Sequence, residues 1–219
     1  MPTPWIIRLH SITGVVPLLA FVAWHAWETA AATGGRERFV LRVTGAKGSA
    51  LAVTLEVGLV IVPLALHVVF GVLRLRTSGP RPGAYADRGS RVLQWGSGAV
   101  VLAFLAVHLG HTWVAKVAGL GPFGLYEALR TDLPQPLYLG VYVVGLTALC
   151  VHVGQGVGAF AATWSLAPSH GAVRVWRWAG GVAAAVLWVI VLNTVSHFAT
   201  GEALLFRVDP LPAEETSGP

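Results

Sequence analysis

The first long apolar stretch of the chain, residues 8–28, reads RLHSITGVVPLLAFVAWHAWE. No Asp, Glu, Lys or Arg lies between Arg8 and Glu28, and about 20 apolar residues are enough for a helix to cross the hydrocarbon core of a bilayer. His25 lies near the far end of this stretch. An ionisable side chain inside a membrane span is costly and marks a candidate functional site. The stretch therefore predicts a spanning helix that carries a site.

The same pattern recurs along the chain, of which 11% of residues are charged and 55% hydrophobic. The charge-free stretches are residues 9–27, 57–73, 92–115, 133–173 and 178–201. Mean hydropathy is +0.67, well above that of an ordinary soluble domain. We predict an all-α integral membrane protein with five transmembrane helices, at about residues 9–33, 50–75, 92–117, 137–164 and 176–201. Residues 209–219 would be a short, disordered polar tail.

The first helix and the loop charges bear on location. Arg8 precedes the helix and Ala30, Ala31 and Ala32 resemble a signal-peptide cleavage site. The apolar run is longer than a typical signal peptide and contains His25, so we expect it to be retained. Placing the N-terminus in the cytoplasm puts eight of the 15 basic residues inside, a narrow majority under the positive-inside rule. We predict a prokaryotic inner (cytoplasmic) membrane with the N-terminus inside.

Four histidines lie at matched depths, one in each of the first four predicted helices: His25, His67, His108 and His152. Counted from entry points at Leu9, Leu51, Val92 and Leu137, each is about 15 or 16 residues along its helix, or roughly 22 to 24 Å at 1.5 Å per residue. Successive helices run in opposite directions. His25 and His108 therefore share an outer level and His67 and His152 an inner level, roughly 15 to 20 Å apart.

Two neutral imidazoles from opposing helices are what bis-histidine haem ligation requires. Two pairs at two depths predict helices I to IV as a bundle around two stacked haems. The chain has no Cys-x-x-Cys-His sequence, so any haem would be bound without the thioether attachment of c-type sites. We expect four haem-iron ligands: His25, His67, His108 and His152.

Zinc binding or simple core packing would account for less of this histidine pattern. Zinc would need four clustered nitrogen or sulfur ligands, but the two levels are too far apart to pool their histidines and the only thiol is Cys150. A single histidine on an apolar face is usually a core residue that donates to a carbonyl. Four such residues in register on alternating helices would be a coincidence, so haem ligation is the preferred interpretation.

Residues 8–14, RLHSITG, together with residues 25–28, HAWE, resemble the first helix of a known family. These are the single-subunit diheme cytochrome b anchors of succinate dehydrogenases and fumarate reductases. The spacing of the four histidines is similar along all five helices. The resemblance implies that His25 and His108 ligate the distal haem and that His67 and His152 ligate the proximal one.

The resemblance also implies partners and a second cofactor. In that family the anchor binds a flavoprotein subunit and an iron-sulfur subunit on the cytoplasmic side, and exchanges electrons with quinone, commonly menaquinone. Dicarboxylate chemistry would then belong to the partners, because this chain has no flavin or iron-sulfur signature. Some fumarate reductase anchors carry a helix IV carboxylate close before the last ligand. Here Cys150 and Val151 stand there, so that proton route is not supported.

The remaining polar residues support weaker predictions. Glu28, with Trp24 and Trp27 as walls, is a candidate quinone site or an interfacial carboxylate. Candidate contacts to the propionates of the inner haem are Arg8, His10, Ser11 and Arg91, which could equally be interfacial anchors. Glu56 could relay protons or pair with Arg42 or Lys47. His111 and His197 could contact the distal haem or quinone, and His170 would be a loop residue.

These observations leave three classes of function. The first is a diheme electron-transfer subunit that exchanges electrons with quinone. The second is the cytochrome b anchor of a different membrane oxidoreductase, and the third is a haem-free transporter whose histidines relay protons. The physiological direction, succinate oxidation or fumarate reduction, does not follow from the sequence, because cofactor potentials that this chain only partly sets decide it.

Overall fold

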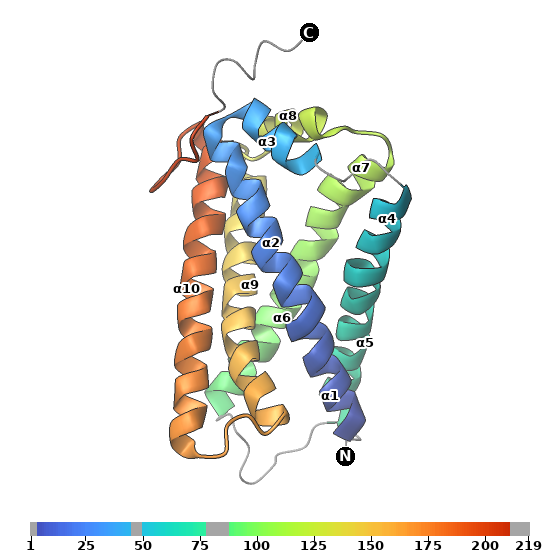
Figure 1. Ribbon diagram of the computed structural model, residues 1–219, viewed down its shortest axis with the longest axis vertical. Coiled ribbons are helices and arrows are strands. Elements are labelled where there is room, and N and C mark those ends of the chain that lie inside the picture. The colour runs from blue at the N-terminus through green and yellow to red at the C-terminus, as the bar shows by residue number, and fades with distance from the viewer. Residues whose placement is uncertain (1–3, 45–49, 78–87, 211–219) are drawn as a thin grey trace.

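The computed structural model describes residues 4–44, 50–77 and 88–210, and all regular structure in these ranges is helical (Figure 1). Five helical stretches are long and apolar enough to cross a membrane: Trp5–Gly34, Val53–Arg74, Gly89–Val117, Pro136–Thr163 and His170–Thr200, here spans 1 to 5. The all-α membrane architecture predicted from the sequence is confirmed. The proposed tail lies almost wholly outside the described residues.

The spans are built from several helical segments. Spans 1 and 2 comprise α1 (Pro4–Thr13), η1 (Gly14–Leu18), α2 (Leu19–Thr29), η2 (Ala30–Gly34), α4 (Ala50–Glu56), η3 (Val57–Ile61) and α5 (Val62–Thr77). Span 3 comprises α6 (Arg88–Leu109), η4 (Gly110–Val114) and α7 (Ala115–Val117); spans 4 and 5 are α9 (Pro136–Thr163) and α10 (His170–Thr200). Two further helices, α3 (Arg36–Thr44) and α8 (Pro122–Asp132), connect spans.

The fifth span begins earlier than the apolar pattern predicts, at His170 rather than near residue 176. Ser169 has extended backbone geometry, and its hydroxyl accepts a hydrogen bond from the amide of Ala172. A serine in this position satisfies one of the free amides at a helix start. The cap therefore extends the helix into a polar segment that hydropathy alone leaves out.

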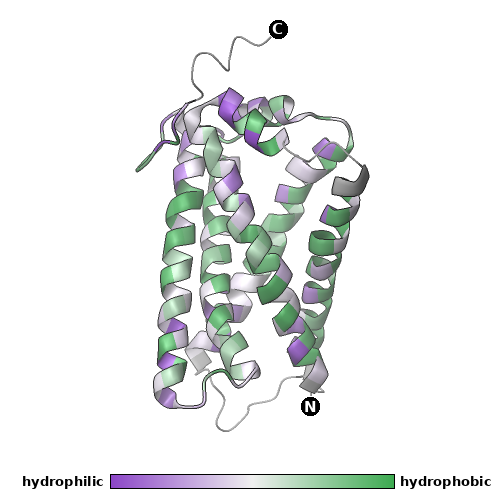
Figure 2. Cartoon of the chain, in the orientation of Figure 1, coloured by the Kyte–Doolittle hydropathy of each residue, from purple (hydrophilic) through white to green (hydrophobic). Residues whose placement is uncertain are grey.

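The spans form an upright bundle in which α9 contacts both α6 and α10, and α1 contacts α5 (Figure 1). Hydropathic colouring is mostly green along the spans and purple near their ends (Figure 2). Spans 4 and 5 approach closely at Gly154 and Gly180, because a Cβ on Gly180 would lie 2.3 Å from the Gly154 carbonyl oxygen. The glycine-rich segment around Gly154 is thus a helix-packing surface.

The two ends of the bundle differ. The end where span 1 begins is called the N-side here, and the end where span 5 finishes is the C-side. At the C-side, α3 and α8 lie across the ends of the spans (Figure 1). They bury a cluster that includes Phe39, Tyr126, Leu129, Leu133 and Phe198. The C-side is therefore covered by the chain itself.

Spans 1, 2 and 3 each contain a π-helical turn, η1, η3 and η4. A π turn inserts one residue, so it changes which side chains face the bundle interior, and such turns are frequent at functional sites. η1 contains Pro17, which cannot donate an amide hydrogen bond. η4 begins two residues after His108, and η1 begins at Gly14, which faces His67. Two of these three π turns, η1 and η4, therefore lie beside the histidines.

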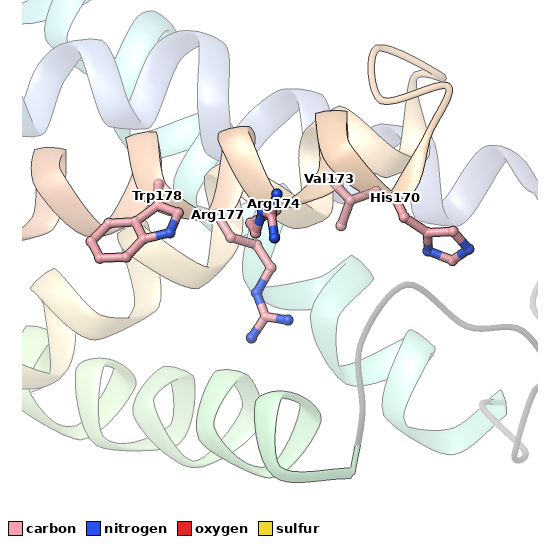
Figure 3. Close-up of a pocket in the computed structure, with 5 residues that line it drawn as sticks. All are labelled: His170, Val173, Arg174, Arg177 and Trp178. Atoms are coloured by element: carbon pink, nitrogen blue, oxygen red, sulfur yellow. The ribbon is translucent and has the colours of Figure 1, made fainter.

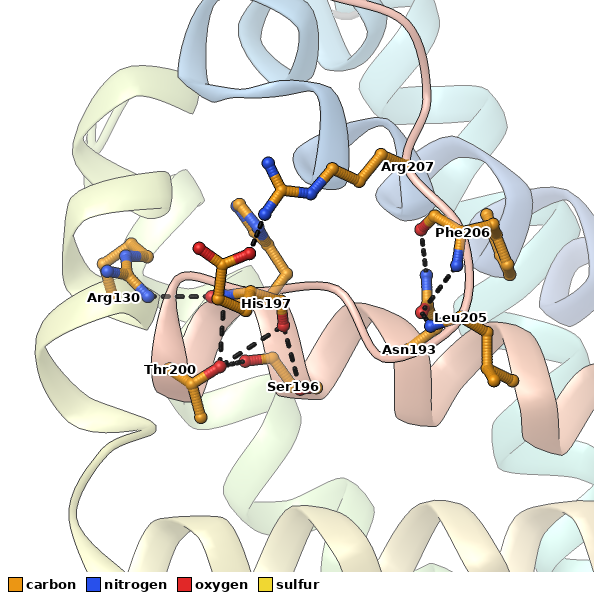
Figure 4. A network of polar contacts seen from close by, with 9 residues as sticks. Arg130, Asn193, Ser196, His197, Thr200, Leu205, Phe206 and Arg207 are labelled. Carbon is orange, nitrogen blue, oxygen red and sulfur yellow. Dashed lines mark hydrogen bonds and ion pairs between the residues drawn. The ribbon is translucent and has the colours of Figure 1, made fainter.

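After α10 the chain turns back over the C-side. Gly201 ends the helix in the left-handed region, at φ 88°, where glycine carries no Cβ penalty. The fully buried Asn193 then accepts from the amide of Leu205 and donates to the carbonyl of Phe206 (Figure 4). Further on, the amide of Val208 donates to the Thr33 hydroxyl at 3.0 Å. This return ties the end of span 1 to span 5.

Candidate functional site

His25 and His108 face each other across the interior of the bundle. Their ring centres are 6.1 Å apart and the ring planes make an angle of 71°. Phe21 stacks on His25 at 5.2 Å, and Phe104 stacks on His108 at 5.3 Å. Span 1 and span 3 thus contribute one imidazole each, and an aromatic ring one turn before each imidazole supports it.

His67 and His152 form a second pair of the same dimensions. Their ring centres are also 6.1 Å apart, and the planes are nearly perpendicular at 89°. Spans 2 and 4 supply these two residues. The structure therefore brings the four histidines together in the two pairs that the alternating helix directions predict.

The two pairs lie at different depths. His67 contacts His10 on span 1, and His25 is 15 residues beyond His10, or about 22 Å further along that span. His152 contacts Gln94 on span 3, and His108 is 14 residues beyond Gln94, or about 21 Å. We call His67 and His152 the N-side pair, and His25 and His108 the C-side pair.

The rings of His67, His152 and His108 each have their Nδ1 atom within hydrogen-bond distance of an oxygen. Nδ1 of His67 lies 2.9 Å from the carbonyl oxygen of His10, and Nδ1 of His152 lies 3.1 Å from that of Gln94. Nδ1 of His108 lies 3.3 Å from the hydroxyl of Tyr142. A ring that donates through Nδ1 presents the lone pair of Nε2, and ligating histidines are oriented in this way.

Glycines on the facing helices make room for the rings. A Cβ on Gly14 would lie 2.5 Å from Cε1 of His67, and a Cβ on Gly98 would lie 3.0 Å from Cε1 of His152. Gly71 similarly faces His10, at 3.2 Å. The glycines therefore admit the imidazoles of neighbouring spans, a use that helix composition alone did not distinguish from general close packing.

The residues present fit a metal held between two histidines. A metal ion bonded at about 2 Å to one nitrogen of each ring needs ring centres roughly 6 Å apart, and both pairs have that spacing. In the described ranges no three or more His, Cys, Asp or Glu side chains cluster closely enough to hold a metal ion. The donor set is therefore two imidazoles per site, which suits haem iron, whose porphyrin supplies the other ligands.

Of the four candidate propionate contacts, the structure brings one into direct contact with the N-side pair. His10 stacks on His67, with ring centres 4.0 Å apart and an angle of 19°. Arg8 is exposed and its guanidinium lies over the ring of Trp164, 5.6 Å from its centre. Ser11 and Arg91 are half-buried on spans 1 and 3. The proximity of His10 to a proposed ligand is therefore the main finding in this group.

The three residues proposed as a quinone site differ in exposure. Glu28 is 3% exposed, whereas Trp24 is 55% exposed and Trp27 50%. The two indoles contact each other, at 5.2 Å between ring centres, and Arg42 lies 3.6 Å over the ring of Trp27. The tryptophans thus lie on the surface of span 1, while the Glu28 carboxylate is inside the protein.

The structure identifies contact partners for Glu56, His111 and His197, whose roles the sequence left open. Glu56 forms an ion pair with Lys116 of span 3, which is neither of the partners considered from the sequence. His111 Nε2 lies 2.6 Å from Asp132, and His197 Nε2 lies 3.0 Å from the hydroxyl of Tyr126. None of these contacts could be read from spacing, because each joins residues far apart in the sequence.

His170 lines a basic pocket at the N-side rather than standing alone in a loop (Figure 3). The pocket has a volume of about 520 Å³ and its other lining residues are Val173, Arg174, Arg177 and Trp178, all on the first turns of α10. Arg177 also donates to the hydroxyl of Ser90, at 3.3 Å. This pocket lies at the N-side end of α10 and is a surface feature.

Several polar residues that contact the paired histidines were not predicted from the sequence. Tyr142 is 5% exposed and contacts His108, and Gln94 and Ser97 lie beside His152. Ser97 is 8% exposed, and Oε1 of Gln94 is buried without a partner among the described residues. Their polar side chains inside predicted spans could have marked them as candidate site residues. Only the histidines were considered in this way.

The fold and the paired histidines define a class: five-span integral membrane proteins with one inward histidine in each of the first four spans. Among curated proteins, the chain is similar to the succinate dehydrogenase cytochrome b558 subunit of Bacillus subtilis (strain 168). The two are 29% identical over 170 residues, which is 77% of this chain and 83% of that protein. The chain is a homologue of that subunit, as its resemblance to cytochrome b anchors predicted. No family model and no solved structure matches.

Proposed function

We propose that the protein is the diheme cytochrome b membrane anchor of a succinate dehydrogenase or fumarate reductase complex. In this proposal it carries electrons between an iron-sulfur subunit and membrane quinone. The observation that carries the proposal is the presence of two histidine pairs of equal ring spacing at two depths of one bundle. The similarity to a succinate dehydrogenase cytochrome b subunit supports it independently.

In the proposed sites, His25 and His108 bind one haem b and His67 and His152 bind the other. Haem iron, when bound, supplies reversible one-electron chemistry, with a potential that its axial ligands and their hydrogen bonds tune. The protein's task is to present the four Nε2 lone pairs. The oxygens of His10 and Gln94 do this for the N-side pair, because they engage Nδ1 of each ring.

Apolar spans surround the proposed ligands. At the C-side, α3 and α8 also lie across the ends of the helices (Figure 1). A low dielectric around a redox centre and restricted solvent access both affect its potential. The fold therefore places the two proposed sites in apolar surroundings at two depths of the bundle.

Sidedness and partners follow from the same proposal. The N-side would face the cytoplasm and contact the flavoprotein and iron-sulfur subunits. The basic residues favour this only narrowly, because eight of the 15, among them Arg8, Arg74 and Arg91, belong to this end and seven to the other. Quinone, which we propose to be menaquinone, would exchange electrons with the anchor from the lipid.

A reduced-minus-oxidised absorption spectrum of the purified chain, with haem quantified against protein, tests the proposal. Two b-type haems per chain are expected. A chain that contains no haem after expression in a haem-replete host would refute it and favour the histidine-relay transporter. Copurification with flavoprotein and iron-sulfur subunits distinguishes this anchor from the cytochrome b anchor of another oxidoreductase.

A further inference from the structure

A continuous row of polar side chains joins the surface of the C-side to His108. Asp132, the last residue of α8, has Oδ2 at 2.6 Å from Nε2 of His111. Nδ1 of His111 lies 3.5 Å from the hydroxyl of Tyr142, and that hydroxyl lies 3.3 Å from Nδ1 of His108. Three separate elements, α8, span 3 and α9, therefore contribute to one row.

If His108 uses Nε2 as a ligand and His111 is neutral, the protons in this row can be arranged in only one direction. Nδ1 of His108 then carries hydrogen and donates to the Tyr142 oxygen, and the Tyr142 hydroxyl donates to Nδ1 of His111. Nε2 of His111 carries hydrogen and donates to the carboxylate of Asp132. Every donor is used once, and the row ends on a formal negative charge.

Packing fixes the tyrosine in this position. Tyr142 is 5% exposed, and the ring of Phe104 meets it edge to face at 5.3 Å while stacking on His108 at 25°. Phe104 fits only because residue 145 is glycine, since a Cβ there would lie 2.3 Å from Cγ of Phe104. The phenol therefore has no room to turn away from His108.

The N-side pair has no such row among the described residues. The Nδ1 atoms of His67 and His152 lie against neutral groups, which are the backbone carbonyls of His10 and Gln94 and the side chains of Thr13, Gln94 and Ser97. A hydrogen-bond chain that ends on a carboxylate polarises each of its members more strongly than a single neutral acceptor does. His108 should therefore donate more electron density to a bound metal than the N-side histidines donate.

We propose that Tyr142 is a positioning residue for His108, and that the row through His111 to Asp132 gives the C-side haem a lower reduction potential than this site would otherwise have. The proposal rests on the proposed function, because it requires His108 to be a haem ligand. More electron density on the axial ligand stabilises the oxidised iron. The row thus helps to set the order of the two potentials along the path to quinone.

The test is Tyr142→Phe in the full chain, which removes the hydroxyl and keeps the ring. Potentiometric titration of the haem absorption should show two haems, one with a raised midpoint potential and one unchanged. The low-spin electron paramagnetic resonance signal of the shifted haem should also change. Asp132→Asn, on α8 outside the spans, removes the charge and should raise the same potential by a smaller amount.

Tyr126→Phe is the matched control. Tyr126 also donates or accepts at a histidine, His197, at the same end of the bundle, but that contact does not extend to either pair. Its loss should leave both potentials unchanged. A shift of both potentials in every variant would indicate a general structural effect and overturn the inference.

The outcomes separate this inference from the proposed function. Two haems with unmoved potentials in both Tyr142→Phe and Asp132→Asn refute the row and leave the diheme anchor standing. A wild-type chain without haem refutes the anchor itself. If Tyr142→Phe fails to fold, Asp132→Asn alone decides, because its side chain is partly exposed and its backbone ends a helix outside the membrane.

Discussion

His10 and His67 exchange two hydrogen bonds between span 1 and span 2. Nδ1 of His10 lies 2.9 Å from the carbonyl oxygen of His67, and Nδ1 of His67 lies 2.9 Å from the carbonyl oxygen of His10. The two rings stack between these bonds. The proposed ligand His67 is thus held by a backbone atom of residue 10 and by the ring of that residue, which have separable roles.

Replacement of these two histidines by alanine should have different effects. His67→Ala removes a proposed ligand, so haem content should fall from two to one per chain. His10→Ala keeps the carbonyl that holds Nδ1 of His67, so both haems should remain, with an altered potential for the N-side haem. The measurement is the pyridine haemochrome content of each purified variant and its redox titration.

Loss of both haems from His67→Ala in a protein with unchanged helical content would contradict the independent pairing. Loss of a haem from His10→Ala would show that the ring of His10, and not only its carbonyl, is needed. His25→Ala serves as the reciprocal variant, since it should remove the C-side haem and leave the N-side haem in place.

Substitution of the glycines that face the histidine rings by alanine should lower haem content to different degrees. Gly14→Ala would place a Cβ 2.5 Å from His67, Gly98→Ala would place one 3.0 Å from His152, and Gly58→Ala meets nothing within 4 Å. Gly14 and Gly58 both lie in π-helical turns, so Gly58→Ala is a matched control. N-side haem content should fall most for Gly14→Ala, less for Gly98→Ala and not at all for Gly58→Ala.

This series also separates crowding from helix propensity. Alanine favours a helix over glycine by about 1 kcal/mol, so the substitutions should not unfold the spans through propensity. Equal haem content in Gly14→Ala and the wild type, measured at equal helicity, would show that the His67 ring is not confined by Gly14.

The sequence predicted the features that depend only on the position of a residue along its own helix. Charge-free length identified the five spans, and the position of each histidine within its span predicted the pairing of His25 with His108 and of His67 with His152. These predictions succeed because a helix advances by a constant rise and because consecutive spans alternate in direction. Neither property requires knowledge of side-chain contacts.

What the sequence did not predict depends on rotation about the helix axis. The π turns η1, η3 and η4 shift the facing side chains, and nothing in the hydropathy of spans 1 to 3 indicates them. The burial of Glu28 beside the exposed Trp24 and Trp27 was not predicted either, because it depends on which neighbouring segments cover span 1. Contacts such as Tyr142 with His108 depend on two helices at once.

The ion pair between Glu56 and Lys116 should contribute modestly to the stability of the protein. Their ion pair joins span 2 to span 3, and their side chains are 27% and 30% exposed. Partly exposed pairs contribute about 0 to 1 kcal/mol, so Glu56→Gln should lower thermal stability in detergent only slightly. The charge-reversed double variant, Glu56→Lys with Lys116→Glu, should recover the loss. No recovery would mean that the charges act through other groups.

Ionisation of the Tyr126 phenol should lower the stability of the protein at alkaline pH. Burial raises the pKa of the Tyr126 phenol above its usual value of 10.0. Because the folded protein binds this proton more tightly, the associated stability is present below pH 10 and is lost as the pH rises through the folded pKa. The wild type should lose stability above pH 10 more steeply than Tyr126→Phe. Parallel losses in both proteins would exclude this phenol as the cause.

Arg130 should anchor the end of span 5. Its Nη1 donates to the carbonyl of His197 at 2.7 Å (Figure 4). It also donates to the carbonyl of Phe198 at 2.8 Å, and both carbonyls lie in the last turn of α10. The His197 carbonyl also accepts from the amide of Gly201, but carbonyls in the last turn of a helix carry a partial negative charge that attracts a cation. Hydrogen bonds that involve a charged group contribute about 1.5 to 3 kcal/mol, so Arg130→Met should lower the thermal midpoint clearly while keeping the apolar stem.

The control for Arg130 lies in the same region. Arg207 forms an ion pair with Glu202, but the two side chains are 59% and 73% exposed, and exposed pairs contribute little. Arg207→Met should therefore leave the midpoint nearly unchanged when unfolding is followed by circular dichroism in detergent. If both variants lost the same stability, the cause would be the loss of positive charge at the C-side. The hydrogen bonds from Arg130 to the end of α10 would then not be the cause.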